Sequence, residues 1–169
     1  MICEDEASLR QDSTLHATWA TKGSQPLIPV SGQRRSVKVF ACIELYTARL
    51  VYERSTTFNA DTYLHFLETV ERKYRGRKVH LIHDNASYHT DAKIGKWFHS
   101  NRSWITPHSL PPYCPEFNPA EKIWKYARKN ATHNQYFRTE IEMIDCLTSV
   151  FTGIQRRPAI FRNYLTPFI

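Results

Sequence analysis

The stretch SVKVFACIELYTARLVYERS, residues 36–55, decides the fold class of this sequence. Residues 36–45 are apolar and include β-branched and aromatic side chains, which is typical of a buried strand. Residues 46–48 predict a turn, and residues 49–55 alternate between apolar and polar side chains as a half-buried strand does. The stretch therefore predicts a β-hairpin.

Strand and helix patterns alternate after this hairpin. Asn59 can cap a helix over residues 60–74, where apolar side chains recur at the i, i+3, i+4 and i+7 positions. The later segments predict a strand at 78–83, a helix at 91–101, a strand at 103–106, a helix opening at Asn118 and a last helix at 139–154.

The N-terminal segments are harder to assign. Residues 1–6 are long enough only for the end of a strand, and residues 7–35 are polar with scattered Gly and Pro, which is typical of irregular structure or a small hairpin. The resulting order predicts an α/β fold with a mixed β-β-β-α-β-α-β-α sheet and helices on both faces.

Composition restricts the class of protein. The 169 residues fit one domain, and 41% apolar residues suffice for a core, which argues against intrinsic disorder. No apolar run approaches the ~18–20 residues of a membrane helix, and the N-terminus lacks signal-peptide features. We therefore expect a soluble, cytoplasmic protein without a membrane partner, nucleoid-associated if bacterial.

Charge and cysteine content give weaker indications. The net charge of +7 fits either ordinary solubility or a polyanionic partner such as nucleic acid. The four cysteines are scattered without a C-x-x-C pair, so we expect packing thiols rather than disulfides or a zinc site: Cys3, Cys42, Cys114 and Cys146.

Two segments contain acids at positions suited to catalysis. In LIHDNASYH (81–89), Asp84 ends a buried strand, where open α/β sheets place their sites, although an Asx turn would also explain it. In LPPYCPEFNPAEKIW (110–124), Glu121 follows a proline-rich approach. There the alternative is a capping box with Asn118 as N-cap and Pro119 as the first helical residue.

Acids from three segments together predict a metal site. Glu4, Asp5 and Glu6 at the end of a first strand would join Asp84 and Glu121. Mg²⁺ prefers such oxygen ligands, and two ions ~3.5–4 Å apart can activate a water or 3′-hydroxyl and stabilise the departing oxygen of a phosphodiester.

These segments resemble the catalytic domain of a DDE transposase in the insertion-sequence branch of the mariner superfamily. The matching segments are EDE (4–6), TWATKGSQP (18–26), SVKVFACIEL (36–45), HDNASYH (83–89) and LPPYCPEFNPAEKIW (110–124). The resemblance implies a ribonuclease-H-like fold. It also implies cleavage and joining of double-stranded DNA at transposon ends and target, with two Mg²⁺ or Mn²⁺ ions and a homodimer or larger multimer.

The same resemblance assigns residues. It implies that Asp5, Asp84 and Glu121 are the catalytic, metal-binding triad, with Asp5 chosen over its neighbours because the family has Asp followed by Glu. Asn85 and His89 are weaker candidates for DNA contact, and a polar surface residue is the alternative for His89.

Basic and aromatic residues have two interpretations each. Lys122, Lys125 and Lys129 lie at i, i+3 and i+7, so they share a helix face that is either merely solvated or contacts DNA phosphates. The four tryptophans are expected in the core rather than as base-stacking platforms: Trp19, Trp97, Trp104 and Trp124.

The family pattern includes helix-turn-helix domains before the catalytic domain, and residues 1–169 match the catalytic part alone. We therefore expect residues 1–169 to be a single catalytic domain without the helix-turn-helix domains. A separately encoded helix-turn-helix protein is a possible partner. A catalytically inactive, transposon-derived DNA-binding or dimerisation remnant is the alternative function. Another ribonuclease-H-like nuclease is disfavoured by the segment FNPAEKIW (117–124).

Overall fold

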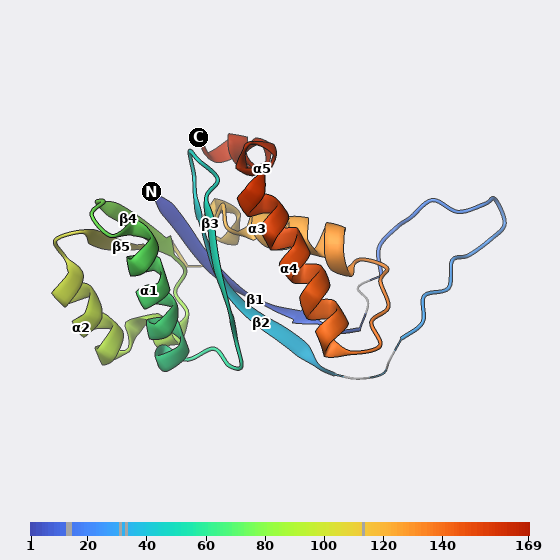
Figure 1. Ribbon diagram of the computed structural model, residues 1–169, viewed down its shortest axis with the longest axis horizontal. Helices are drawn as coiled ribbons and strands as arrows, with labels where there is room; N and C mark the ends of the chain where they lie inside the picture. Colours follow the sequence, from blue (N-terminus) through green and yellow to red (C-terminus); the bar gives the residue numbers. More distant parts are fainter. Residues whose placement is uncertain (13–14, 31, 33, 113) are drawn as a thin grey trace.

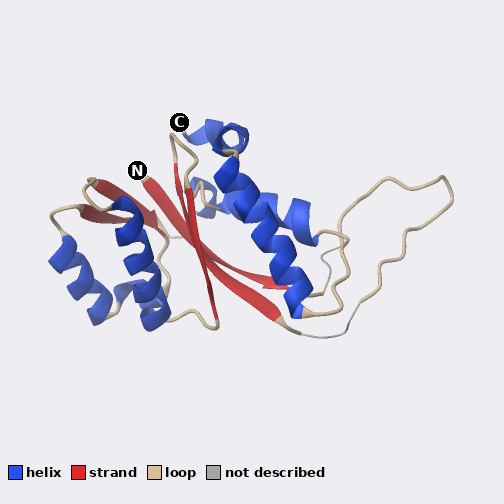
Figure 2. Cartoon of the chain, viewed as in Figure 1, coloured by secondary structure: helices blue, strands red, loops and turns tan. Residues whose placement is uncertain are grey.

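A five-stranded mixed sheet forms the centre of the protein in a computed structural model, which describes residues 1–12, 15–30, 32, 34–112 and 114–169 (Figures 1 and 2). Its strands are β1 (Ile2–Arg10), β2 (Ser36–Glu44), β3 (Leu50–Ser55), β4 (Val79–His83) and β5 (Ile105–Ser109). They are ordered β3-β2-β1-β4-β5. β1 is antiparallel to β2 and parallel to β4, so the predicted mixed sheet is confirmed.

Helices cover both faces of the sheet (Figure 2). The helices are α1 (Ala60–Tyr74), α2 (Ala92–Asn101), α3 (Glu121–Ala127), α4 (Glu140–Arg156) and α5 (Pro158–Leu165). Helices α1 and α2 lie over one face, and α3, α4 and α5 lie over the other, as Figure 1 shows. No helix in the described part of the chain is long and apolar enough to span a membrane.

Strand β1 divides its side chains between these two faces. Cys3, Ala7 and Leu9 pack in the core beneath α3 and α4, whereas Ile2 packs in the core beneath α1. Because successive side chains of a strand point to opposite faces, Asp5 faces α3 and its two glutamate neighbours face α1. This alternation sets the positions of all the acids discussed below.

The first strand is longer than the sequence predicted. It continues through residues 7–10 and pairs along its whole length with β2, from Ile2 opposite Glu44 to Arg10 opposite Ser36. The expectation that residues 1–6 hold only a strand end is therefore wrong. Burial of Ala7 and Leu9 under the α3–α4 layer stabilises the extension, although four residues were too short a pattern to recognise as a strand.

Smaller differences occur at other boundaries. β5 begins at Ile105 rather than at residue 103, and α5 was not predicted because Pro158 was not recognised as a first helical residue. Residues 15–30, between β1 and β2, form a long arm that extends away from the sheet (Figure 1). Trp19 lies on this arm fully exposed, so its predicted core position is wrong.

Candidate active site

Asp5 lies in the middle of β1 on the side of α3, and it is almost fully buried. Its Oδ2 accepts a hydrogen bond of 2.9 Å from Nε1 of Trp124, which is a buried residue of α3. Burial raises the pKa of the Asp5 carboxyl to about 7, an effect that the Trp124 hydrogen bond opposes and the charges of Glu6 and Glu121 reinforce. A cation beside this carboxylate would relieve the cost of its burial.

Asp84 directly follows β4 and remains about half exposed. Its Oδ1 accepts a hydrogen bond of 2.9 Å from the backbone N–H of Ala86, which is the Asx-turn geometry that the sequence allowed. The Nδ1 of His89 lies 3.3 Å from the same oxygen, and this contact is the main reason why the pKa of Asp84 is below its ordinary value. Asp84 is therefore anionic near neutral pH.

Glu121 is the first residue of α3, so the predicted helix start at Asn118 is wrong, and the capping box considered as an alternative role for Glu121 does not form. The Asn118 carboxamide accepts a hydrogen bond of 3.1 Å from the backbone N–H of Ala120 and donates one of 3.0 Å to the backbone carbonyl of Glu4. Asn118 thus ties the proline-rich approach to β1. This leaves the Glu121 carboxylate free to face the site, because it is not used to cap the helix.

These three acids line one cavity of about 430 Å³. β1 and β4 are parallel neighbours, with Ile2 opposite Leu81 and Cys3 opposite Ile82, so Asp5 and the residue after β4 lie at adjacent positions. Other lining residues come from the loops after β4 and β5 and from the approach to α3: Asn85, Ala86, Leu110, Pro111, Pro112, Cys114 and Asn118. Nδ2 of Asn85 donates a hydrogen bond of 2.6 Å to the carbonyl of Leu110, so Asn85 joins two of the loops.

The acids suit a hard divalent cation. Carboxylate oxygens of Asp5, Glu6 and Asp84 all lie within 4.8 Å of one another, and Glu121 lines the same cavity. One buried oxygen of Glu6 has no hydrogen-bond partner among the described residues. Clustered carboxylates with unsatisfied oxygens are the donors that Mg²⁺ and Mn²⁺ prefer. Glu6 was set aside at the sequence level, although its place beside Asp5 could have included it.

His89 is buried, which does not fit either expectation for it, a DNA contact or a polar surface residue. It lies in η1 (Ser87–Thr90) with its side chain 1% exposed, and its Nδ1 lies 3.0 Å from Nδ1 of His83. Burial lowers the pKa of His83 to about 4, so that imidazole is neutral at physiological pH. The packing of η1 against α1 and α2, which no local pattern in HDNASYH reveals, explains the difference.

The three lysines that follow Glu121 do not line one common surface. Nζ of Lys122 lies 5.6 Å from the ring centre of Phe168, whereas Lys125 and Lys129 line a separate hollow with Arg128. Helix α3 ends at Ala127 and a π-helical turn, η3 (Arg128–Thr132), follows it, which changes the angle between successive side chains. None of these lysines lines the cavity around Asp5.

Comparison with known proteins identifies related folds. The family model described as DDE superfamily endonuclease matches residues 1–144. The Mos1 mariner paired-end complex with Mn is similar, with a TM-score of 0.65 and 17% identity over 98% of this chain and 53% of that chain. A pre-cleavage Mos1 transpososome has a TM-score of 0.66 and 15% identity over 98% and 55%.

The catalytic domain of Mos1 mariner transposase has a TM-score of 0.58 and 15% identity, over 98% of this chain and 78% of that one. The chain spans about half the length of the two longer Mos1 chains. No curated protein matches the sequence significantly. At these identities the structural likeness establishes the fold, and it confirms the ribonuclease-H-like prediction.

Proposed function

The chain belongs to the DDE superfamily endonuclease family, and from that premise we propose that it is a transposase catalytic domain that cleaves and joins DNA phosphodiesters at transposon ends. The observation that carries the proposal is the meeting of Asp5, Asp84 and Glu121 in one cavity, from β1, the end of β4 and the start of α3. We assign these three residues as the catalytic triad.

The residues of the cavity would hold two divalent ions. Asp5, Asp84 and Glu121 would hold them, because all three line the cavity and carboxylate oxygens of Asp5 and Asp84 lie within 4.8 Å of each other. Ions bound there would activate a water or a 3′-hydroxyl and stabilise the departing oxygen. The indole of Trp124 orients Asp5, and the Ala86 N–H together with His89 orients Asp84.

DNA would bind through charge outside the cavity. Lys125, Arg128 and Lys129 line a hollow with His16 and His133, whose rings stack at 4.6 Å. Such a group of cations suits phosphate oxygens and would bind DNA independently of its sequence. The similar structures include paired-end and strand-transfer complexes, which supports a multimer acting on two DNA ends. End selection by a separately encoded helix-turn-helix part stays a prediction.

Joining of a pre-cut DNA end tests this function. A duplex with a free 3′-hydroxyl at the element's terminus is incubated with supercoiled plasmid, the protein and Mg²⁺ or Mn²⁺. Wild type should join the end to the plasmid, and Asp84→Asn should not. Asp145→Asn, an exposed position of α4, is the matched control and should retain activity. Equal joining by Asp84→Asn would overturn the assignment of Asp84 as a catalytic residue. Absence of joining by every protein with either metal would favour the inactive DNA-binding remnant.

A further inference from the structure

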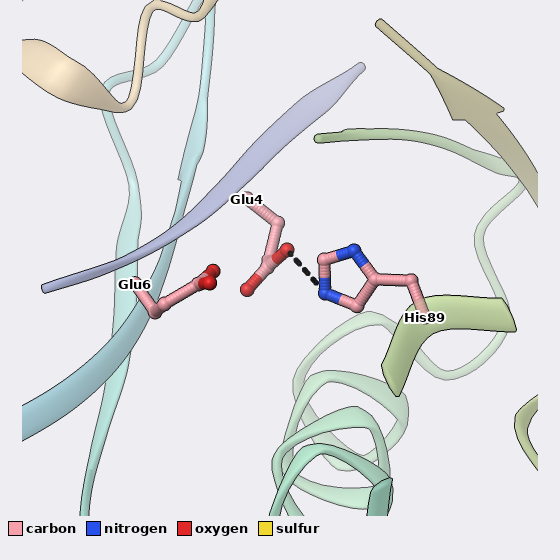
Figure 3. A group of neighbouring side chains, drawn as sticks. All are labelled: Glu4, Glu6 and His89. Carbon is pink, nitrogen blue, oxygen red and sulfur yellow. Dashed lines mark ion pairs between the residues drawn. The ribbon is translucent and has the colours of Figure 1, made fainter. Parts of the chain in front are cut away.

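A second group of metal-ligating side chains lies on the opposite face of β1 from Asp5. Glu4 and Glu6 point toward α1 and η1, where they meet His89 (Figure 3). The Glu4 side chain is fully buried and the His89 side chain is 1% exposed. Burial, followed by the charges of Glu6, Asp5 and Asp84, raises the pKa of Glu4 well above its usual range.

These buried groups lack ordinary partners. Both oxygens of Glu4, one oxygen of Glu6 and Nε2 of His89 are buried and make no hydrogen bond of ordinary geometry in the described part of the chain. Burial raises the pKa of Glu6, and the Tyr88 hydroxyl, which interacts with Glu6, lowers that pKa to a smaller extent. Glu4 forms an ion pair with His89, at 3.7 Å between Oε2 and Nε2. No Lys or Arg among the described residues pairs with either glutamate. Burial of several unsatisfied acceptors in one place costs free energy, and a bound cation or proton would reduce that cost.

The other ring nitrogen of His89 sets which form of the imidazole faces Glu4. Nδ1 lies 3.0 Å from Nδ1 of the neutral His83, 3.1 Å from the backbone carbonyl of Asp84 and 3.3 Å from the Asp84 carboxylate. Two oxygen acceptors at Nδ1 favour the tautomer that carries its proton there, which leaves a lone pair at Nε2 directed at Glu4 (Figure 3). Metal-binding histidines commonly donate their second N–H to a carbonyl or carboxylate in this manner.

We propose that Glu4, Glu6 and His89 form a buried binding site for a Zn²⁺-type cation, separate from the ions held by Asp5, Asp84 and Glu121. The three ligand atoms lie within 4.8 Å of one another. The 3.7 Å between Glu4 and His89 is close to the ~3.4 Å that separates two ligands of a tetrahedral Zn²⁺. An imidazole with carboxylates suits Zn²⁺ better than Mg²⁺, which prefers oxygen ligands and retained waters.

A cation in this site would connect β1 to η1. Because His89 also contacts Asp84, the cation would hold Asp84 in place from behind the cavity. The inference does not depend on the proposed DNA chemistry, since a zinc site of this kind stabilises the fold whether or not DNA is cleaved.

Zinc binding to the whole chain tests the proposal. His80 and His108, whose ring nitrogens lie 2.9 Å apart on exposed strand positions, could also bind zinc, so every protein carries His108→Gln. Equilibrium dialysis against Zn²⁺ with excess Mg²⁺ should show one tight site in this background and in Glu121→Gln. Glu4→Gln and His89→Gln should each bind zinc at least ten times more weakly. Equal affinity in all four proteins, or loss only in Glu121→Gln, would overturn the site.

A measurement on the unmutated site covers the case in which a variant fails to fold. X-ray absorption at the zinc edge of the loaded His108→Gln protein should show one imidazole together with oxygen ligands, and its melting temperature should rise with Zn²⁺. A spectrum with oxygen ligands alone, or absence of tight zinc binding, would show that protons rather than a metal neutralise the cluster.

Discussion

Trp124 of α3 donates a hydrogen bond of 2.9 Å to Asp5 of β1, across 119 positions of sequence. This bond fixes a carboxylate that would otherwise rotate freely, and it lowers the pKa of Asp5 against the effect of burial. It also joins the helix that begins with Glu121 to the strand that contains Asp5, so two members of the proposed triad share one rigid contact.

Replacement of Trp124 by Phe should affect both stability and the pH profile. Loss of the indole N–H removes a buried hydrogen bond and part of a buried ring, at a cost of about 1–3 kcal/mol in unfolding free energy. Because the pKa of Asp5 rises without this donor, the limb of metal-dependent nicking that rises with pH should move to higher pH. Trp97→Phe on α2 should leave that limb in place, and a shared shift in both variants would argue against a role through Asp5.

The charge of Asp5 should destabilise the metal-free fold at high pH. The pKa of Asp5 in the folded protein is about 7, above its ordinary 3.8. The free energy of unfolding is therefore highest below pH 4, where Asp5 is protonated in both states, and it falls as the pH rises toward 7. Asp5→Asn removes this pH-dependent loss. The unfolding free energy of the variant relative to that of wild type should therefore increase by on the order of 2 kcal/mol between pH 5 and pH 8. Urea unfolding in chelator measures it, and an advantage independent of pH would contradict the raised pKa.

Loss of the Asn118 carboxamide should loosen the approach to α3. Asn118→Ala leaves the Glu4 carbonyl and the Ala120 N–H unpaired in a buried place, at a cost of about 1–3 kcal/mol. Asn130→Ala removes one exposed hydrogen bond to the Tyr126 carbonyl and should cost much less. Chemical denaturation compares the two, and similar losses would show that Asn118 does not tie the loop to β1.

Two lysines should govern the salt dependence of DNA binding. Lys125→Gln with Lys129→Gln should weaken binding to any duplex and reduce the slope of log K against log salt by about 0.9 for each lost phosphate contact. Lys96→Gln, an exposed residue on α2 over the opposite face of the sheet, is the control and should leave the slope unchanged. Fluorescence anisotropy over a salt series distinguishes the two surfaces.

Local patterns predicted the elements that depend on local physics. The helix at 60–74 has the predicted bounds, because the side chains of Asn59 and Thr62 cap each other's backbone N–H groups and the apolar spacing continues to Tyr74. The resemblance of the motifs to a known family also implied the ribonuclease-H-like fold. These signals lie within a few residues of one another, so a single sequence contains them.

Features that depend on distant packing were not predicted. His89 is buried because η1 packs against α1 and α2 and its ring lies against those of Tyr63 and His83. Asn118 bonds to the Glu4 carbonyl rather than capping its own helix. Glu4 and Glu6 were treated only as alternatives to Asp5. The alternation of a strand already places them on its other face, so a longer predicted β1 would have separated the two groups of acids.

Metal-dependent nicking by three triad variants tests the central claim most directly. Supercoiled plasmid carrying the element's ends is incubated with Mg²⁺ or Mn²⁺ and with Asp5→Asn, Asp84→Asn or Glu121→Gln, with Glu68→Gln on α1 as the control. Each triad variant should lose about a thousandfold in rate, which corresponds to about 4 kcal/mol of transition-state stabilisation, while the control retains wild-type activity. Nicking by a folded triad variant at the wild-type rate would contradict the assignment of these acids as the metal-binding catalytic residues.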